Sequence, residues 1–359
     1  METLLDIKNL SVSFDTYAGT VKAVRNVSFQ VKEGETVAVV GESGCGKTVT
    51  AKSIMGLVKS PPGRVEDGSQ ILFEGKNIFD FTKEEWEKYR GEKCAIIFQD
   101  ALAALNPTIQ VGKQIGEMLK LHTKMNAEQI KQEVIRLMES VGIPEAEQRC
   151  KQYPHEFSGG QRQRIMIAMA LACTPKLLIA DEPTTSLDVT VQAQILELLQ
   201  QMKLKSGVAV LLITHNLGIV AKAADRLVVM YGGEVVEQGS SMDIFYRARH
   251  PYTWALINAV PRIDVKLEEE LTTIEGTPPD LIQPPTGCVF HPRCPYCMEI
   301  CRKRKPQVTA DGEHISFCWL IHPCYNFEQG AFALSTFSMN SVKSASFEVQ
   351  INPVKYLLI

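Results

Sequence analysis

Residues 5–32 alternate between apolar and polar positions, as in DIKNLSVSF and NVSFQVK, with little helical period. This alternation predicts an antiparallel sheet exposed on one face, and we expect short strands across residues 5–32. An apolar run follows at Thr36–Val40, and after it come a glycine-rich loop and a helical pattern. The chain is therefore expected to pass from an antiparallel sheet into a strand–loop–helix unit.

Helical and apolar segments alternate through the middle of the chain. Residues 83–90 and 110–140 are charged and helix-like, and Gly142 ends the second stretch. The runs KLLIADE and VAVLLITH are apolar up to their last residues, which is typical of fully buried strands. The stretch RLVVMYGGEVVEQG predicts a hairpin joined through Gly232 and Gly233.

The pattern changes near residue 250. HPYTWALINAVPRIDVK predicts a short helix that ends at Pro261, and the proline-rich stretch after it has neither helical nor strand period. GCVFHPRCPYCMEICRKRK then places four cysteines in residues 287–305, and Cys318 and Cys324 follow. The final stretch, 325–359, is weakly patterned and carries no predicted function.

Composition and charge limit the class of protein. The 359 residues are 45% apolar and 22% charged, which is ordinary for a globular chain, and the net charge of −3 argues neither for nor against nucleic acid. The start lacks the features of a signal peptide, and no apolar run approaches the roughly 20 residues that span a bilayer. We therefore expect a cytosolic protein, in which clustered cysteines indicate a metal rather than disulfides.

GESGCGKT fits the phosphate-binding loop pattern G-x-x-x-x-G-K-[ST], and its flanking strand and helix favour this over a glycine turn that happens to carry a lysine. Backbone N–H groups and the positive end of the helix dipole would surround phosphates. Lys47 is expected to reach the β- and γ-phosphates, and Thr48 to hold Mg²⁺. The expected nucleotide contacts are Gly41, Glu42, Ser43, Gly44, Cys45, Gly46, Lys47, Thr48 and Val49.

Polar residues end the two later apolar runs: Asp181 and Glu182 end one, and His215 ends the other. Ligands bind at the carboxyl ends of strands in open parallel sheets, so these residues are expected to meet Lys47 at one edge. Asp181 suits Mg²⁺, and Glu182 would polarise the attacking water of a phosphoryl transfer. Taken alone, Asp181 could equally be a strand-end cap.

FSGGQRQR places Ser158 as a helix N-cap before Gly159 and Gly160, which let the backbone approach a phosphate. The helix after it is expected to bury one face, made of Ile165, Ala168, Met169 and Ala172. This is a second anion-binding helix terminus in one chain. One chain rarely needs two such sites for one nucleotide, so a dimer in which each such helix closes on the partner's nucleotide is the economical explanation.

The same motif resembles the signature of ABC-type ATPases, and the resemblance covers roughly residues 4–260. It implies an α/β fold: a P-loop NTPase (RecA-like) core with an antiparallel β subdomain and an α-helical subdomain at about 100–165. It also implies a glutamine, Gln99, between the core and the helical subdomain, and a dimer-interface loop at Ser186–Asp188. Phe14 stands where an adenine-stacking aromatic is expected, with Tyr17 as its rival.

The residues that this resemblance assigns fall into three sets. The catalytic set is Lys47, Gln99, Glu182 and His215, of which His215 would contact the γ-phosphate. The Mg²⁺ set is Thr48, Gln99 and Asp181. The remaining nucleotide contacts are Phe14, Ser158, Gly159, Gly160, Gln161, Asp181 and Asp188.

FQDALAALNP, RQRIMIAMAL and the stretch from HPYTWALINAVPRID to PPTGCVFHPRCPYCMEIC resemble the dipeptide/oligopeptide/nickel permease group. The resemblance implies an ATPase domain at 4–255, a cysteine-rich C-terminal extension at 256–325 and an unassigned tail at 326–359. The implied function is ATP hydrolysis that energises import of di- and oligopeptides; nickel or another small solute is the alternative. The implied partners are a second ATPase subunit in a heterodimer or homodimer, two transmembrane permease subunits and an extracytoplasmic binding protein, at the cytoplasmic membrane face.

Within that group, Cys288, Cys294, Cys301 and Cys318 are similar to a [4Fe–4S] site, which needs four thiolates. Zinc stays open because Cys294 and Cys297 form a C-x2-C pair, and unliganded cysteines are a third interpretation. Cys297 and Cys324 are expected to be spare.

Two other functions would fit parts of this sequence. An ABC ATPase acting on DNA or ribosomes is disfavoured because the chain has one P-loop and no long coiled coil. A nucleic-acid-binding zinc module is disfavoured because the basic run at 302–305 has no interleaved aromatic residues.

Overall fold

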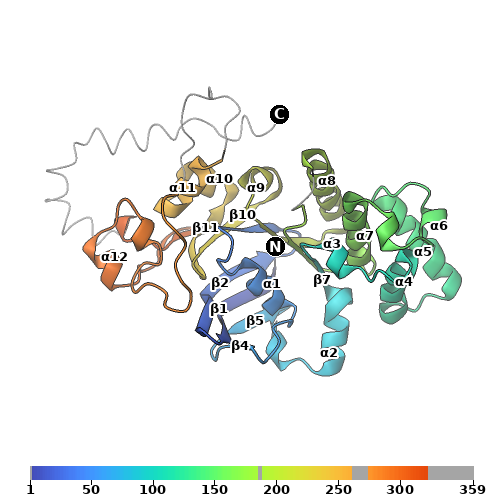
Figure 1. The fold of residues 1–359 in the computed structure, drawn as a ribbon, viewed down its shortest axis with the longest axis horizontal. Helices are drawn as coiled ribbons and strands as arrows, with labels where there is room; N and C mark the ends of the chain where they lie inside the picture. The colour runs from blue at the N-terminus through green and yellow to red at the C-terminus, as the bar shows by residue number, and fades with distance from the viewer. Residues whose placement is uncertain (1, 185–187, 261–273, 322–359) are drawn as a thin grey trace.

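The computed structural model describes residues 2–184, 188–260 and 274–321. The predictions for Ser186, Pro261, Cys324 and the tail 326–359 lie outside these residues. Two sheets, a group of helices and a C-terminal extension make up the described part (Figure 1). Within it, none of the helices has both the length and the apolar character needed to cross a membrane.

The strands are β1 (Thr3–Thr16), β2 (Gly19–Lys32), β3 (Thr36–Val40), β4 (Gly63–Val65), β5 (Gln70–Phe73), β6 (Lys76–Asn77), β7 (Cys94–Ile97), β8 (Leu177–Asp181), β9 (Ala209–Thr214), β10 (Arg226–Tyr231), β11 (Glu234–Ser240), β12 (Thr309–Asp311) and β13 (His314–Ser316). The helices are α1 (Lys47–Ile54), α2 (Lys83–Lys88), α3 (Ala101–Ala104), α4 (Val111–His122), α5 (Ala127–Ser140), α6 (Ala146–Arg149), α7 (Gly159–Leu171), α8 (Val189–Ser206), α9 (Leu217–Ala223), α10 (Ser241–Arg247), α11 (Pro251–Asn258) and α12 (Glu299–Lys303).

The larger sheet has eight strands in the order β12-β13-β11-β10-β3-β9-β8-β7. Strands β7, β8, β9, β3 and β10 run parallel, and β11 returns antiparallel to β10 through the predicted Gly232–Gly233 turn. β3, β8 and β9 are buried along their whole length, because layers of side chains cover both faces of the sheet. The predicted α/β class and its buried apolar strands are therefore confirmed.

The smaller sheet, in the order β2-β1-β5-β6 with β4 also paired to β1, is antiparallel as predicted. The prediction of short strands was wrong, because β1 and β2 are 14 residues each and form one long hairpin. Irregular pairing between Ile7 and Leu10 interrupts the alternation without ending either strand. Asn9 and Asn26 adopt a positive φ of 52° at these irregular points, a conformation that asparagine tolerates.

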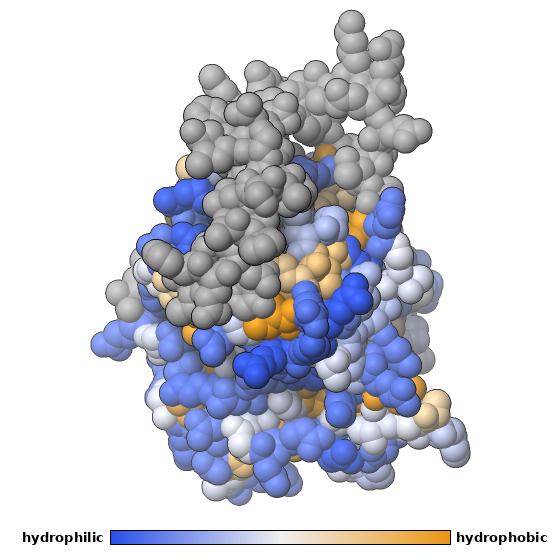
Figure 2. All heavy atoms as spheres, turned by 90° about the vertical axis from the view of Figure 1, so that its left-hand side faces the viewer, coloured by the Kyte–Doolittle hydropathy of each residue, from blue (hydrophilic) through white to orange (hydrophobic). Residues whose placement is uncertain are grey.

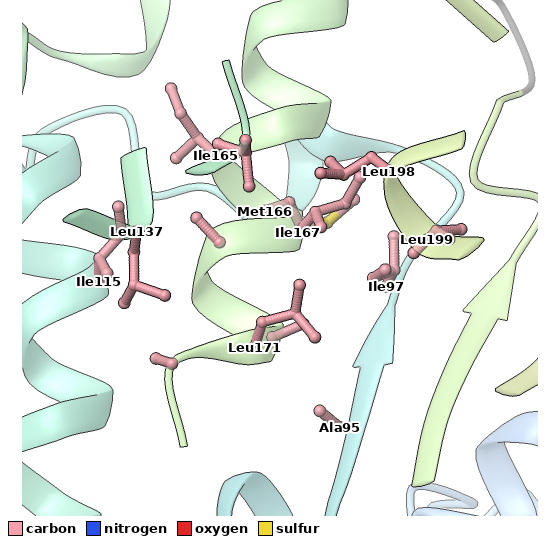
Figure 3. Packing of buried hydrophobic residues seen from close by; sticks show 14 of the residues in the cluster. Ala95, Ile97, Ile115, Leu137, Ile165, Met166, Ile167, Leu171, Leu198 and Leu199 are labelled. Atoms are coloured by element: carbon pink, nitrogen blue, oxygen red, sulfur yellow. The ribbon is translucent and has the colours of Figure 1, made fainter. Parts of the chain in front are cut away.

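Helices α3 to α7 form the helical group beside β7 (Figure 1), and α7 contacts α3, α4, α5 and β7. Ile165, Ile167 and Leu171 of α7 belong to one core that also takes in β7, α4, α5 and α8 (Figure 3). The prediction that α7 buries a single face was wrong. Met166 and Ile167 are as buried as Ile165, because neighbours cover the helix on most sides, whereas Met169 is only partly buried.

The described part of the C-terminal extension contacts the rest of the chain in two ways. The hairpin β12–β13 pairs with β11 and so extends the larger sheet. Val289 and Phe290 also share a core with Tyr231 and Tyr252. The face that carries α12 is mostly hydrophilic, with a small group of apolar residues near its centre (Figure 2).

Candidate functional site

The loop from Gly41 to Gly46 joins the carboxyl end of β3 to the N-terminus of α1. Gly41 (φ 151°) and Gly46 (φ 100°) adopt backbone conformations that residues with side chains rarely reach. A Cβ at Gly41 would lie 2.1 Å from the carbonyl oxygen of Met230, and one at Gly46 would lie 2.5 Å from that of Ala23. The glycines therefore let the loop pack tightly against β2 and β10.

Lys47 and Thr48 begin α1 and connect this loop to its surroundings. The ammonium of Lys47, only 5% exposed, donates hydrogen bonds to the carbonyl oxygens of Gly41 (2.8 Å) and Glu42 (2.9 Å). The hydroxyl of Thr48 donates to Oδ1 of Asp181 at 3.0 Å. The carboxyl ends of β3 and β8 thus meet, as their positions in the parallel sheet led us to expect.

Glu182 lies between two other predicted residues. Nε2 of Gln99 donates to its Oε2 at 3.0 Å, and Nδ1 of His215 lies 3.2 Å from its Oε1. Glu182 adopts a positive φ of 48°, a strained backbone conformation that is found most often at functional sites. Residues that follow β7, β8 and β9 are therefore brought to one edge, together with the loop that follows β3.

The electrostatics of this edge favour a bound cation. Burial raises the pKa of Asp181, the hydrogen bond from Thr48 lowers it, and the adjacent charge of Glu182 raises it further. A divalent cation would relieve both the burial penalty and the repulsion, because it stabilises the ionised form. Carboxylate and hydroxyl oxygens are the ligands that Mg²⁺ prefers.

The signature residues lie in a different part of the molecule. Ser158 accepts a hydrogen bond from the backbone N–H of Gln161 at 3.3 Å, so it is the predicted N-cap of α7. Gly159 and Gly160 form the first turn of this helix in the helical group, whereas the phosphate-binding loop leads into α1 (Figure 1). Asp188 caps α8 by accepting a hydrogen bond from Val191 N–H at 2.9 Å.

The two candidate adenine-stacking residues differ in exposure. Phe14 is partly buried and pairs with Gly63 across β1 and β4. Tyr17 is fully exposed in the turn between β1 and β2. The choice between the two stays a prediction.

The four predicted cysteine ligands line one cavity in the C-terminal extension. Its walls include Cys288, Cys294, Cys301, Cys318 and, from the start of α11, His250. Cys297 does not line it, and its Sγ lies 3.6 Å from the carbonyl oxygen of Met298. The structure thus groups the same four thiols as the sequence resemblance did.

The metal predicted for these thiols is not supported by their arrangement. Within the described ranges, no three His, Cys, Asp or Glu side chains are placed so that they could hold a metal ion. Burial raises the pKa of Cys288 and Cys318 to about 12 and that of Cys294 to about 11. Such thiols are protonated at neutral pH, and only a bound cation would make them thiolates.

His250 is a cavity residue that the sequence did not single out. It is 1% exposed, and its Nδ1 accepts a hydrogen bond from Tyr252 N–H at 3.1 Å. A neutral ring that accepts at Nδ1 carries its proton on Nε2, and this buried atom has no hydrogen-bond partner among the described residues. Burial lowers the pKa of His250 to about 4, which keeps the ring neutral.

Comparison with known proteins adds a separate line of support. Residues 24–185 match the family described as "ABC transporter", and residues 236–301 match "Oligopeptide/dipeptide transporter, C-terminal region". The dipeptide transport ATP-binding protein DppD of Bacillus subtilis (strain 168) is 53% identical over 89% of this chain and 95% of its own length. The oligopeptide transport ATP-binding protein OppD of Escherichia coli (strain K12) is 48% identical over 85% of this chain and 89% of its own length.

Solved structures agree on the fold. A dimeric, post-hydrolysis ATP-binding cassette, MJ0796 bound to ADP and phosphate, superposes with a TM-score of 0.59 at 26% identity. The alignment covers 66% of this chain and 98% of that one. The protein cbiO1 from Clostridium perfringens, described as part of an ABC transporter complex, gives a TM-score of 0.58 at 28% identity over 68% of this chain and 91% of its own.

Proposed function

The chain belongs to the ABC transporter family of peptide-transport ATP-binding proteins, and from that membership we propose that it hydrolyses ATP to drive a membrane importer of di- and oligopeptides. The observation that carries the ATPase assignment is the meeting of Lys47, Thr48, Asp181, Glu182, Gln99 and His215 at one sheet edge. The peptide substrate is supported by relatives that share about half of the residues over most of the chain.

The chemistry follows from what each side chain can do. Backbone N–H groups of the loop and the ammonium of Lys47 would bind the phosphates. Thr48, Gln99 and Asp181 would hold the Mg²⁺ that neutralises the phosphate charge. Glu182 orients the attacking water by accepting its proton in a hydrogen bond. Gln99 and His215 hold the Glu182 carboxylate from both sides and can transfer their hydrogen bonds to the γ-phosphate region when it arrives.

A dimer completes this site. Ser158, Gly159 and Gly160 form an anion-binding helix terminus that lies away from the chain's own loop, so it is available to the nucleotide of a second subunit. The dimeric state of the MJ0796 cassette supports this arrangement. Either a second copy or a homologous subunit serves as the partner, and Asp188 lies at the same interface.

The rest of the importer consists of two transmembrane permease subunits and an extracytoplasmic binding protein. We place this chain at the cytoplasmic face, where helical residues of about 100–165 contact the permease. ATP binding closes the dimer, and loss of the γ-phosphate reopens it. We keep as a proposal the domain boundaries predicted from the sequence, 4–255 for the ATPase and 256–325 for the extension.

We further propose that the extension holds a [4Fe–4S] cluster. The proposal rests on the donor types and not on their present geometry, which does not hold a metal among the described residues. Four cysteines and no carboxylate line the cavity, and Cys297, whose pairing with Cys294 favoured zinc, does not line it. The buried Nε2–H of His250 supplies a donor of the kind that hydrogen-bonds to cluster sulfur. When bound, the cluster would supply charge that keeps the thiols ionised and would cross-link a segment with little core of its own.

Uptake measurements test the transport function. Cells whose own copy carries Glu182→Gln should lose uptake of labelled dipeptides and keep uptake of nickel, and cells with the exposed change Glu139→Gln should keep both. Loss of nickel uptake alone would overturn the peptide assignment. Purification of the tagged chain from membranes should recover permease subunits, and recovery with ribosomes or DNA instead would overturn the transporter role.

A further inference from the structure

Arg293 links the C-terminal extension to the phosphate-binding loop. It precedes Cys294 directly, and its side chain is 6% exposed. One terminal nitrogen donates to Oε2 of Glu42 at 2.8 Å and to the hydroxyl of Tyr231 at 3.1 Å. The other nitrogens donate to the carbonyl oxygens of Glu275 (2.8 Å) and Ile274 (2.9 Å). The guanidinium is therefore held in one orientation by four partners.

Glu42 is the second residue of the phosphate-binding loop, and three of its groups are held at once. Its carboxylate pairs with Arg293, and its backbone N–H donates to the hydroxyl of Tyr252 at 3.0 Å. Its carbonyl oxygen accepts from Lys47 at 2.9 Å. Two of these three contacts come from residues next to the cysteine-lined cavity, because Tyr252 follows Pro251 and Arg293 precedes Cys294, and both Pro251 and Cys294 line it.

Packed rings stiffen this connection. The ring centroids of Tyr231 and Tyr252 lie 4.6 Å apart, and Phe290 lies 5.1 Å from Tyr231 and 5.3 Å from Tyr252. All three rings are almost completely buried, so they have little freedom to adjust independently. Phe290 also lines the cysteine cavity, so the cavity wall and the loop support are parts of one packed cluster.

We propose that Arg293 is a positioning residue for ATP: together with Tyr252 it holds the phosphate-binding loop at Glu42, so that the packing of the cysteine-bearing extension sets the affinity of the loop for nucleotide. The inference rests on the proposed ATPase function, and it assigns to the extension a role at the nucleotide site itself. Arg293 contacts the loop through the carboxylate of Glu42, so its loss should alter nucleotide binding more than turnover.

Steady-state kinetics on the full-length chain test this. Arg293→Met should raise the KM for ATP about 5- to 20-fold, the range of a moderate coupling between sites, and change kcat by less than about twofold. Arg293→Lys keeps the charge but cannot reproduce the forked contacts, and it should fall between Arg293→Met and wild type. Arg302→Met, an exposed arginine of the same extension, is the matched control and should behave as wild type.

Glu42 provides the second arm. Glu42→Gln should also raise the KM for ATP. Adding Arg293→Met to Glu42→Gln should raise the KM by a smaller factor than Arg293→Met does in wild type, because the ion pair is already gone. Independent, multiplicative effects of the two changes would overturn the proposal. So would a KM for Arg293→Met or Arg293→Lys within twofold of wild type, or a parallel fall of kcat and melting temperature with KM unchanged.

ATP binding by the wild-type protein distinguishes a failure of the Arg293 proposal from a failure of the proposed ATPase function. If wild type binds ATP in a titration and Lys47→Ala does not, the ATPase assignment stands whatever the arginine variants do. If wild type itself binds no ATP, the proposed function fails, and this inference fails with it.

Discussion

The amide of Gln99 donates a hydrogen bond of 3.0 Å to the carboxylate of Glu182, although the two residues lie 83 positions apart in the chain. Gln99 follows β7 at the entrance to the helical group, and Glu182 follows β8 beside the phosphate-binding loop. Any movement of Gln99 toward a γ-phosphate must weaken its bond to Glu182. The helical group and the carboxylate that we propose to be catalytic are therefore linked by an exchangeable hydrogen bond.

Replacement of Glu182 by glutamine should separate binding from hydrolysis. The amide keeps an oxygen acceptor but loses the basic charge, so we expect ATP affinity within about twofold of wild type and an ATPase rate lower by about 10²- to 10⁴-fold. Phosphate release and an ATP titration measure the two quantities. Glu139→Gln on the exposed side of α5 should change neither. A normal steady-state rate in Glu182→Gln would contradict the role given to this carboxylate.

Lys47→Ala should weaken nucleotide binding directly. The buried ammonium is the charged donor of the loop, and the loss of one or two charge-assisted hydrogen bonds corresponds to about a 10- to 100-fold lower affinity. Isothermal titration with ATP and Mg²⁺ measures this. Lys59→Ala, an exposed lysine, serves as the control. Unchanged affinity in Lys47→Ala would argue against the phosphate-binding loop.

The two neighbouring cysteines Cys294 and Cys297 provide a matched pair for the metal proposal. Cys294 lines the cavity and Cys297 does not, so Cys294→Ser should lose iron and visible absorbance after anaerobic purification, while Cys297→Ser keeps both. Iron and zinc per chain decide the metal. Colourless, iron-free wild-type protein would contradict the cluster, and equal loss from both variants would contradict the choice of ligands.

Stability should fall on acidification because of His250. Its pKa is lowered to about 4 by burial, against about 6.5 in an unfolded chain, so only the unfolded form takes up a proton between these values. The stabilisation is complete above about pH 6.5 and is lost as the pH falls toward 4, by about 3 kcal/mol in total. Urea unfolding at pH 7 and 4.5 should show a smaller difference for His250→Asn. The exposed His155→Asn should retain the wild-type difference.

The sequence predicted which residues meet at this sheet edge because each element there has a recognisable local pattern. Thr36–Val40 is apolar throughout and carries a complete motif after it, and Asp181 ends an equally apolar strand. The hairpin β1–β2 was mistaken for several short strands because irregular pairing near Asn9 mimics a strand end. Local alternation cannot distinguish a bulge from a turn.

Contacts between segments that lie far apart in the chain could not be predicted from the sequence pattern. Arg293 and Glu42 are 251 positions apart, and nothing in HPRC or GESGCGKT indicates that they pair. Met166 and Ile167 were not predicted as buried because the layers over α7 come from α8 and β7 as well as from its sequence neighbours. Likewise, only the folded structure shows that Nε2 of His250 is buried without a hydrogen-bond partner among the described residues.

The hairpin β12–β13 has a consequence for solubility. Val236, Glu237 and Gln238 of β11 lie in the segment that meets residues 315–317, so the hairpin occupies backbone groups that would otherwise face outward. An open, long strand of this kind invites pairing with a neighbouring molecule. The edge strand of the sheet is instead β12, which is three residues long and ends in Asp311. Its short length and its terminal charge both discourage such pairing. The short hairpin thus protects the ATPase sheet against self-association and aggregation.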